Sequence, residues 1–199
     1  MRGLENYPLF YDAFCSVMEY WGLSRWRDWL VGGARGRTLE VGCGTGRNLH
    51  RYGPGVTLVA VEPDPRMLRV ARRRAPDVLL VRASAEALPF RDGAFDTVVS
   101  SLVFCSVPDA DRGLAEVHRT LRADGRLRMV EHVRSDSRWQ ARWQDLVQPA
   151  WTWCAGGCHP NRRTEQAVER AGFVIEPDGR RRSGTMRRFS ARQGRSARP

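Results

Sequence analysis

A glycine-rich turn is the segment of the chain best suited to bind a ligand. Three glycines stand at alternate positions, Gly42, Gly44 and Gly46, directly after the short apolar stretch 38–41. Glycines let the backbone turn sharply and let a ligand approach it closely, and the N–H groups that follow can bind polar atoms. The spacing is not the Gly-x-Gly-x-x-Gly fingerprint of dinucleotide sites.

Two acidic residues indicate what kind of ligand this turn would hold. Glu40 lies two residues before the first glycine. A carboxylate repels a pyrophosphate but attracts a cationic or amino-bearing group. Glu62 ends the next apolar stretch, 56–61, where it could accept hydrogen bonds from ribose hydroxyls. The pattern therefore favours a nucleoside that carries a positive or amino-bearing group.

Strand-like and helix-like segments alternate on both sides of this turn. Apolar runs predict strands over 38–41, 56–61, 78–81, 95–101, 126–133, 173–176 and 185–191. Amphipathic stretches predict one or two helices within 8–31, one from Arg47, and others over 66–75, 109–121, 135–151 and 164–171. The alternation predicts an α/β fold with a mostly parallel sheet, helices on both faces, and ligands at the carboxyl ends of the strands.

Composition excludes several classes of protein. The 199 residues are 42% hydrophobic, which is too apolar for a disordered chain and enough for a sizeable core. No apolar run approaches the roughly 18–20 residues of a membrane-spanning helix, and the N-terminus lacks a signal-peptide layout. Five scattered cysteines then predict reduced thiols and a cytoplasmic location.

The positive charge of the chain is concentrated towards its C-terminus. All 33 basic residues are arginine, and the net charge is +11. Residues 1–150 carry +4 of this charge and residues 151–199 carry +7. A basic tail can bind nucleic acid or an anionic membrane surface. We favour a solvated terminus, because most charge runs are simply exposed to water.

Five ordered motifs resemble those of class I methyltransferases that use S-adenosylmethionine (SAM). They are EVGCGTG over 40–46, VEPD over 61–64, ASAEALPF over 83–90, FDTVVSSL over 95–102 and LRADGRL over 121–127. The resemblance covers roughly residues 36–176. It implies a Rossmann-like fold and an enzyme that transfers the methyl group of SAM by in-line displacement, leaving S-adenosylhomocysteine.

The same resemblance implies which residues bind SAM. They are Glu40, Gly42, Cys43, Gly44, Gly46, Glu62, Pro63, Met67, Ser84, Ala85, Glu86, Ser101 and Leu102. Glu40 would hold the amino end of SAM, Glu62 the ribose, and the loop around Ser84 the adenine. The family usually has an aspartate where this chain has Ser84, which is a shorter and neutral group.

The stretch after the fourth expected strand resembles that of enzymes acting on small molecules. Residues 101–109 lack the Asn/Asp-Pro-Pro-Tyr/Phe segment of amino-directed nucleic-acid methyltransferases, and Cys105 does not follow proline as in cytosine-C5 enzymes. They resemble the loops of quinone-biosynthesis methyltransferases. A narrower resemblance, in 102–107, 131–133 and 143–151, is to a branch that methylates alkyl thiols. It implies a small, apolar acceptor such as a thiol or a phenol.

Two residues are candidates for contact with the acceptor. His132 ends the fifth strand at the edge expected to be catalytic, where it is either a base or positioning group or a structural histidine. Tyr11 would face the sulfonium if the N-terminal helices fold over the pocket; otherwise that segment only packs on the sheet. A thiol has a reference pKa of about 8.5, so it needs little help from a base.

Aromatic and sulfur-bearing residues follow the fifth strand. Trp139, Trp143, Trp151 and Trp153 could wall an apolar acceptor pocket, although we expect at least two of them in the core. The segment 154–159, with two cysteines and a histidine, has no second ligand pair elsewhere in the chain. We therefore expect no metal.

The chain is expected to have three parts. Residues 1–35 would form a helical cap over the cofactor pocket, 36–176 the SAM-binding domain, and 177–199 an Arg-rich tail. The apolar pattern over 185–191 is poor, so the alternatives are a ragged last edge strand, an incomplete sheet or a disordered tail. The alternatives to a small-molecule enzyme are an RNA- or protein-directed methyltransferase that uses the tail, and a SAM-binding protein without catalysis.

Overall fold

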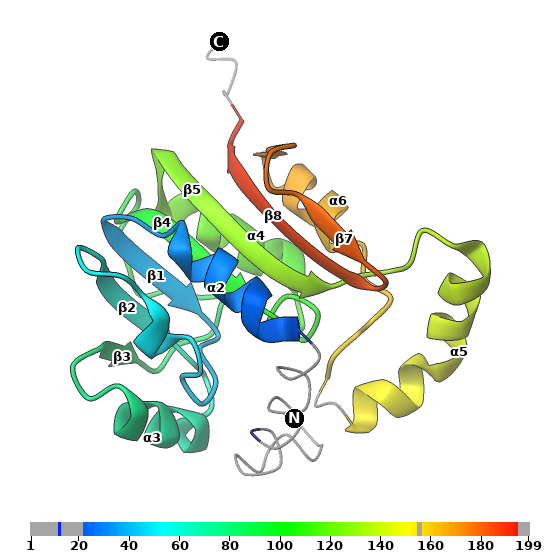
Figure 1. Cartoon of the computed structure of the whole chain (residues 1–199), viewed down its shortest axis with the longest axis horizontal. Helices are drawn as coiled ribbons and strands as arrows, with labels where there is room; N and C mark the ends of the chain where they lie inside the picture. The colour runs from blue at the N-terminus through cyan, green and yellow to red at the C-terminus, as the bar shows by residue number, and fades with distance from the viewer. Residues whose placement is uncertain (1–11, 13–21, 155–156, 195–199) are drawn as a thin grey trace.

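A single mixed sheet organises the chain. The structure, a computed structural model, describes residues 12, 22–154 and 157–194. The strands lie in the order β3-β2-β1-β4-β5-β8-β6, and β7 pairs with β8 (Figure 1). The pairs from β3 to β5 are parallel, and β8 is antiparallel to its neighbours. The predicted α/β fold with a mostly parallel sheet is confirmed.

The bounds of the elements agree with most of the predicted segments. The strands are β1 Arg37–Val41, β2 Thr57–Val61, β3 Leu79–Val81, β4 Phe95–Ser101, β5 Leu121–His132, β6 Phe173–Ile175, β7 Arg181–Ser183 and β8 Met186–Gln193. The helices are α2 Ser24–Gly32, the 3-10 helix η3 Leu49–Arg51, α3 Pro65–Arg74, α4 Ala110–Thr120, α5 Arg138–Cys154 and α6 Thr164–Arg170. The strand β7 was not predicted.

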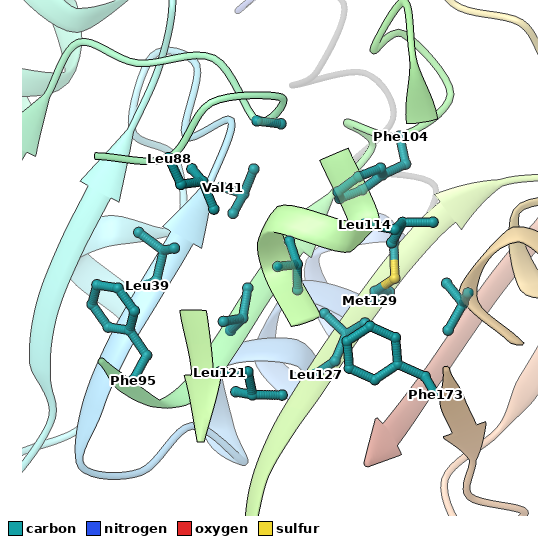
Figure 2. Packing of buried hydrophobic residues seen from close by; sticks show 14 of the residues in the cluster. Leu39, Val41, Leu88, Phe95, Phe104, Leu114, Leu121, Leu127, Met129 and Phe173 are labelled. Carbon is teal, nitrogen blue, oxygen red and sulfur yellow. The ribbon is translucent and has the colours of Figure 1, made fainter. Parts of the chain in front are cut away.

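Alternate residues of the central strands pack against helices on opposite faces of the sheet. Val98 of β4 packs in the same cluster as Leu114 of α4, whereas its neighbour Val99 packs in the cluster of Leu30 of α2. Figure 2 shows the larger cluster, in which the fully buried Leu114 lies close to Met129 of β5. Because both faces are covered, β1 and β4 are buried over almost their whole length.

The segment after the glycine turn differs from the prediction of a helix from Arg47. Only the short helix η3 forms there, because Asn48 and Tyr52 turn inward to hydrogen-bond the buried carboxylate of Glu40. Pro54 follows shortly afterwards and cannot continue a helix.

The last strand lies inside the sheet, not at its edge as we expected. β8 pairs with β5 on one side and with β6 on the other. Its apolar residues Phe189 and Ala191 are fully buried in the main core. The sheet is therefore complete on this side, and residues up to Gln193 are part of it.

Arginine side chains explain why the apolar pattern of β8 looked poor. Arg187 is almost fully buried, and its Nη2 lies 2.9 Å from Oδ2 of Asp136. The guanidinium of Arg188 lies 4.8 Å from the ring centroid of Trp29, and that of Arg128 in β5 lies 4.1 Å from the same ring. The aliphatic part of an arginine side chain can cover apolar surface, and its guanidinium can lie over an aromatic ring. Positions of β8 that the sequence suggests are exposed to solvent can therefore be buried.

We predict that Phe189→Ala lowers the free energy of unfolding by about 3–5 kcal/mol, because it removes a fully buried ring from the core. Val174→Ala is the matched control: Val174 lies in neighbouring β6 and is 45% exposed, so its loss should be under about 1 kcal/mol. Urea unfolding followed by circular dichroism measures both. A Phe189→Ala loss no larger than that of the control would mean that β8 is not part of the cooperative sheet.

Candidate active site

The carboxyl ends of four parallel strands meet at one edge of the sheet. Val41 at the end of β1 pairs with Val61 of β2 on one side and with Ser100 of β4 on the other. Ser101 of β4 pairs in turn with Val130 of β5. The residues that follow these strands therefore lie side by side, as the sequence predicted for the ligand site.

The glycine turn has a backbone shape that other residues would strain. Gly42, Gly44 and Gly46 have φ values of 65°, 55° and 82°. A Cβ atom on Gly42 would lie 2.6 Å from a methyl carbon of Val103, which belongs to the loop after β4. Only the side chain of Val103 separates the turn from this loop, and it leaves no room for a side chain at position 42. Cys43, between the first two glycines, is buried.

Glu62 holds the turn and still has the capacity to bind a ligand. Its Oε2 accepts a hydrogen bond from the backbone N–H of Gly44 at 3.0 Å, and its Oε1 accepts one from Asp64 at 3.0 Å. Burial raises the pKa of this carboxyl. Each carboxylate oxygen can accept a second hydrogen bond, so the position fits the predicted role at a ribose. Pro63 beside it is exposed, and Met67 in the first turn of α3 is buried.

Glu40 is bound by the protein itself. Its Oε1 accepts a hydrogen bond from Nδ2 of Asn48 at 2.8 Å, and its Oε2 accepts one from the hydroxyl of Tyr52 at 2.8 Å. Nη1 of Arg27 donates to Oδ1 of the same Asn48 at 2.7 Å. Burial raises the pKa of Glu40. The carboxylate therefore anchors the segment behind the glycine turn, and direct contact with SAM stays a prediction.

Asp12 contacts the glycine turn and the end of α3. Its Oδ1 accepts a hydrogen bond from Oγ1 of Thr45 at 2.7 Å, and its Oδ2 lies 2.5 Å from Nη2 of Arg74. Burial acts to raise the pKa of Asp12, but the hydrogen bonds from Arg74, Thr45 and Arg47 outweigh it and the pKa is lowered. Tyr11, the neighbouring candidate, lies outside the described residues.

The expected adenine loop is braced by its own side chains. The hydroxyl of Ser84 donates to Oε2 of Glu86 at 3.0 Å, and Oε1 of Glu86 accepts from the backbone N–H of Asp109 at 2.8 Å. Ala85 between them is buried. Glu86 thus holds the loop to the start of α4. The hydroxyl of Ser84 in turn holds the carboxylate of Glu86.

The end of β4 carries two features typical of a ligand-binding site. The hydroxyl oxygen of Ser101 is buried and has no hydrogen-bond partner in the part of the chain that the structure describes. Leu102 has a φ of 58°, a left-handed conformation that costs a branched residue free energy. An unpaired buried hydroxyl next to a strained backbone fits a place where a bound cofactor completes the contacts.

Glu131 is a residue that the sequence analysis did not select. Its Oε1 accepts hydrogen bonds at 3.1 Å from Oγ of Ser100 and from the backbone N–H groups of Val103 and Phe104, and its Oε2 accepts one from Cys105 at 3.3 Å. The side chain is fully buried, and burial raises its pKa to about 7. An acid inside an apolar strand was the available signal. It fixes the loop after β4.

Two thiols, a histidine and a tryptophan gather beside this loop. The backbone N–H of His159 donates to the carbonyl of Cys105 at 2.7 Å, which brings Cys158 next to Cys105. A hydrogen bond with the Cys105 thiol lowers the pKa of Cys158 against the effect of burial, and His132 and Trp151 lower it further. The rings of His132 and Trp151 meet edge to face, 6.5 Å apart. The group favours a negatively charged sulfur.

The expectation that at least two tryptophans of α5 lie in the core is wrong. Trp139, Trp143 and Trp153 are more than half exposed, and of the four only Trp151 contacts His132. The cause is the position of α5, which extends away from the sheet (Figure 1). Within the described ranges, no group of three or more acidic, histidine or cysteine side chains could hold a metal. None of the helices described there is long and apolar enough to cross a bilayer.

The strand order and the site together define the class I architecture of SAM-dependent methyltransferases. Residues 39–129 match a family model described as a methyltransferase domain. The chain belongs to this family of SAM-dependent methyltransferases. SAM is the cofactor of the family, and the glycine turn, Glu62 and the unpaired hydroxyl of Ser101 fit it.

Named relatives and a solved structure resemble this chain. Human thiol S-methyltransferase TMT1A is 37% identical over 143 residues, which cover 68% of this chain and 59% of that protein. Demethylmenaquinone methyltransferase of Thermus thermophilus is 35% identical over 132 residues, covering 61% and 60%. A SAM-dependent methyltransferase of Thermotoga maritima, titled a possible histamine N-methyltransferase, has a TM-score of 0.73 at 23% identity and covers 94% and 96%. The chain spans about three-fifths of the length of these named relatives.

We predict that Glu131→Gln removes a pH dependence of stability. The folded state holds a proton on Glu131 between its usual pKa of 4.5 and about 7, while the unfolded state does not. The free energy of unfolding therefore falls as pH rises, and the native protein should lose about 2 to 3 kcal/mol relative to Glu131→Gln between pH 5 and pH 8.

Urea unfolding at four pH values across this range makes the measurement. Glu169→Gln, which neutralises an exposed carboxylate on α6, is the control and should follow the native curve. Parallel curves for the native protein and Glu131→Gln would contradict the prediction.

Proposed function

We propose that this protein transfers the methyl group of SAM to the sulfur of a small, apolar thiol. The observation that carries the proposal is the geometry at the end of β5, where the rings of His132 and Trp151 meet edge to face and the backbone N–H of His159 binds the carbonyl of Cys105. The Cys105 thiol and His132 lower the pKa of Cys158 there, so the same surroundings suit a negatively charged sulfur. A thiolate is the nucleophilic form of a thiol. The name of the human relative, thiol S-methyltransferase, supports the same acceptor.

The residues of this chain would contribute mainly binding and orientation. SAM, when bound, supplies an activated methyl group. The turn at 42–46, Glu62 and Ser101 would hold it, and the loop 84–86 would lie along its adenine. Glu131 keeps the loop after β4 in one position against the turn. Fixed alignment and exclusion of water are what a methyl transfer needs most from a protein.

His132 is proposed to act on the acceptor. It ends β5, is half-buried, and is among the groups that lower the pKa of Cys158. The same imidazole could hold an acceptor thiolate or take its proton. The free thiols Cys43, Cys105 and Cys158 support a reducing, cytoplasmic surrounding.

Three arginines in or next to β7 and β8 argue against an RNA-binding arm, because their charges are paired within the fold. Arg180 pairs with Glu165, and Arg182 and Arg187 both pair with Asp136. Charges already paired within the fold have little to offer to phosphates. A quinol-like acceptor is the second candidate, which the demethylmenaquinone methyltransferases among the relatives support.

We predict that labelled methyl passes from SAM to a small alkyl thiol, and that His132→Ala slows this transfer about 10²–10⁴-fold if the imidazole serves as base. His118→Ala is the control. His118 lies near the end of α4 and packs against Phe173 of β6, so this variant should keep the native rate. SAM binding by equilibrium dialysis should be the same in all three proteins.

The assay runs a thiol, a phenol, a quinol and total RNA in parallel. Label that appears only in the phenol, the quinol or RNA would overturn the thiol proposal, and so would label found only on Cys158 in a digest of the protein. A loss under tenfold in His132→Ala would refute the proposed role of that residue while leaving the acceptor assigned.

A further inference from the structure

Helix α5 has its polar side towards the protein. Gln144 is buried: its Oε1 accepts from the backbone N–H of Ser135 at 2.8 Å, and its Nε2 donates to the carbonyl of Pro160 at 2.9 Å. One turn further on, Nε2 of Gln148 lies 3.0 Å from Nδ1 of His159, which is outside the helix. A surface helix of a soluble protein normally buries its apolar face and exposes its polar one, so α5 is reversed.

The opposite face of α5 is apolar and exposed. We call it the tryptophan stripe, and its members are Trp139, Trp143, Leu146, Ala150 and Trp153. At about 100° per residue, these positions lie within about 40° of one line along the helix. Trp139, Trp143, Leu146 and Trp153 are 74%, 55%, 71% and 71% exposed. An exposed apolar patch this continuous marks a surface that something else covers.

Two rings of the stripe lie against each other. The rings of Trp139 and Trp143 stack with an interplanar angle of 4° and centroids 6.4 Å apart. The body of the helix projects beyond the sheet (Figure 1), where a broad flat surface could approach it. The stripe is therefore open to contact on the side of α5 that faces away from the sheet.

Positive charge borders the stripe. Arg138 and Arg142 are exposed on α5, and neither forms an ion pair with any residue that the structure describes. The one acid of the helix, Asp145, is already held by Arg134 at 2.7 Å and by Asn161 at 2.9 Å. The face that α5 offers is thus aromatic, apolar and cationic.

We propose that α5 docks on an anionic lipid surface, with the tryptophan stripe among the headgroups and acyl chains and with Arg138 and Arg142 against lipid phosphates. Tryptophan prefers the boundary between water and lipid, and a helix with an apolar aromatic face and flanking cations lies flat in that boundary. A second copy of the chain is disfavoured as the occupant, because it would bring together two arginine-flanked faces of chains that each carry +11.

The test is flotation of the whole protein with vesicles of phosphatidylcholine alone, or of phosphatidylcholine with about a third phosphatidylglycerol. The native protein should float with the anionic vesicles, with a blue shift of tryptophan fluorescence and weaker binding at high salt. The variant Trp139→Gln/Trp143→Gln/Trp153→Gln should lose at least tenfold in affinity. Its urea unfolding should match the native curve, because the three side chains are exposed.

A pair of matched variants separates local from general charge. Arg138→Gln/Arg142→Gln should weaken binding about tenfold or more. Arg69→Gln/Arg73→Gln removes two exposed arginines at the same spacing from α3, beyond the other end of the sheet, and should bind like the native protein. Equal losses in the two pairs would reduce the contact to net charge and overturn the role of α5.

Other occupants give different results. Absence of binding to both vesicles, with a native dimer that the triple tryptophan variant dissolves, would overturn the proposal and assign the stripe to contact between copies. Absence of binding with a monomer would overturn it in favour of cover by the chain's own residues 1–21. None of these readouts depends on methyl transfer, so this proposal and the proposed function fail separately.

Discussion

The buried carboxylate of Glu131 joins β5 to the loop that follows β4, and through that loop it reaches the glycine turn. Three backbone N–H groups and one hydroxyl point at its two oxygens. The loop so held includes Val103, whose methyl groups fill the space over Gly42. Glu131 therefore holds the loop after β4 in its position next to the glycine turn.

Much of the fold could be predicted because its strands are buried on both sides. A run such as 56–61 is too continuously apolar to be exposed, and the breaks between such runs indicate the order of elements. β8 was harder, because Arg187 occupies a buried position on the face of Phe189 and Ala191, where an alternating strand would have an apolar residue, and Arg188 follows it. Their stems and ring contacts are visible only once Trp29 and Asp136 are placed in space.

The site shows the same division between local and distant information. Glu62 could be selected because its role depends on its place directly after β2, three residues before α3 begins. Glu131 and Cys158 could not, because the role of Glu131 depends on partners more than 25 residues away, and that of Cys158 depends first on Cys105 and His132, which also lie more than 25 residues away. Glu40 was selected for its position before the glycine turn. Its carboxylate accepts hydrogen bonds from Asn48 and Tyr52, so it holds the segment after the turn in place.

The contact between Trp151 and His132 joins helix α5 to the end of β5 at the edge that carries the candidate site. Trp151 belongs to α5, and His132 ends the strand beside the loop after β4. A ligand that displaces the indole ring from the imidazole removes a contact that helps to hold α5 in position. By thermodynamic reciprocity, whatever restrains the helix then alters the affinity for that ligand by the same factor by which the ligand alters the restraint.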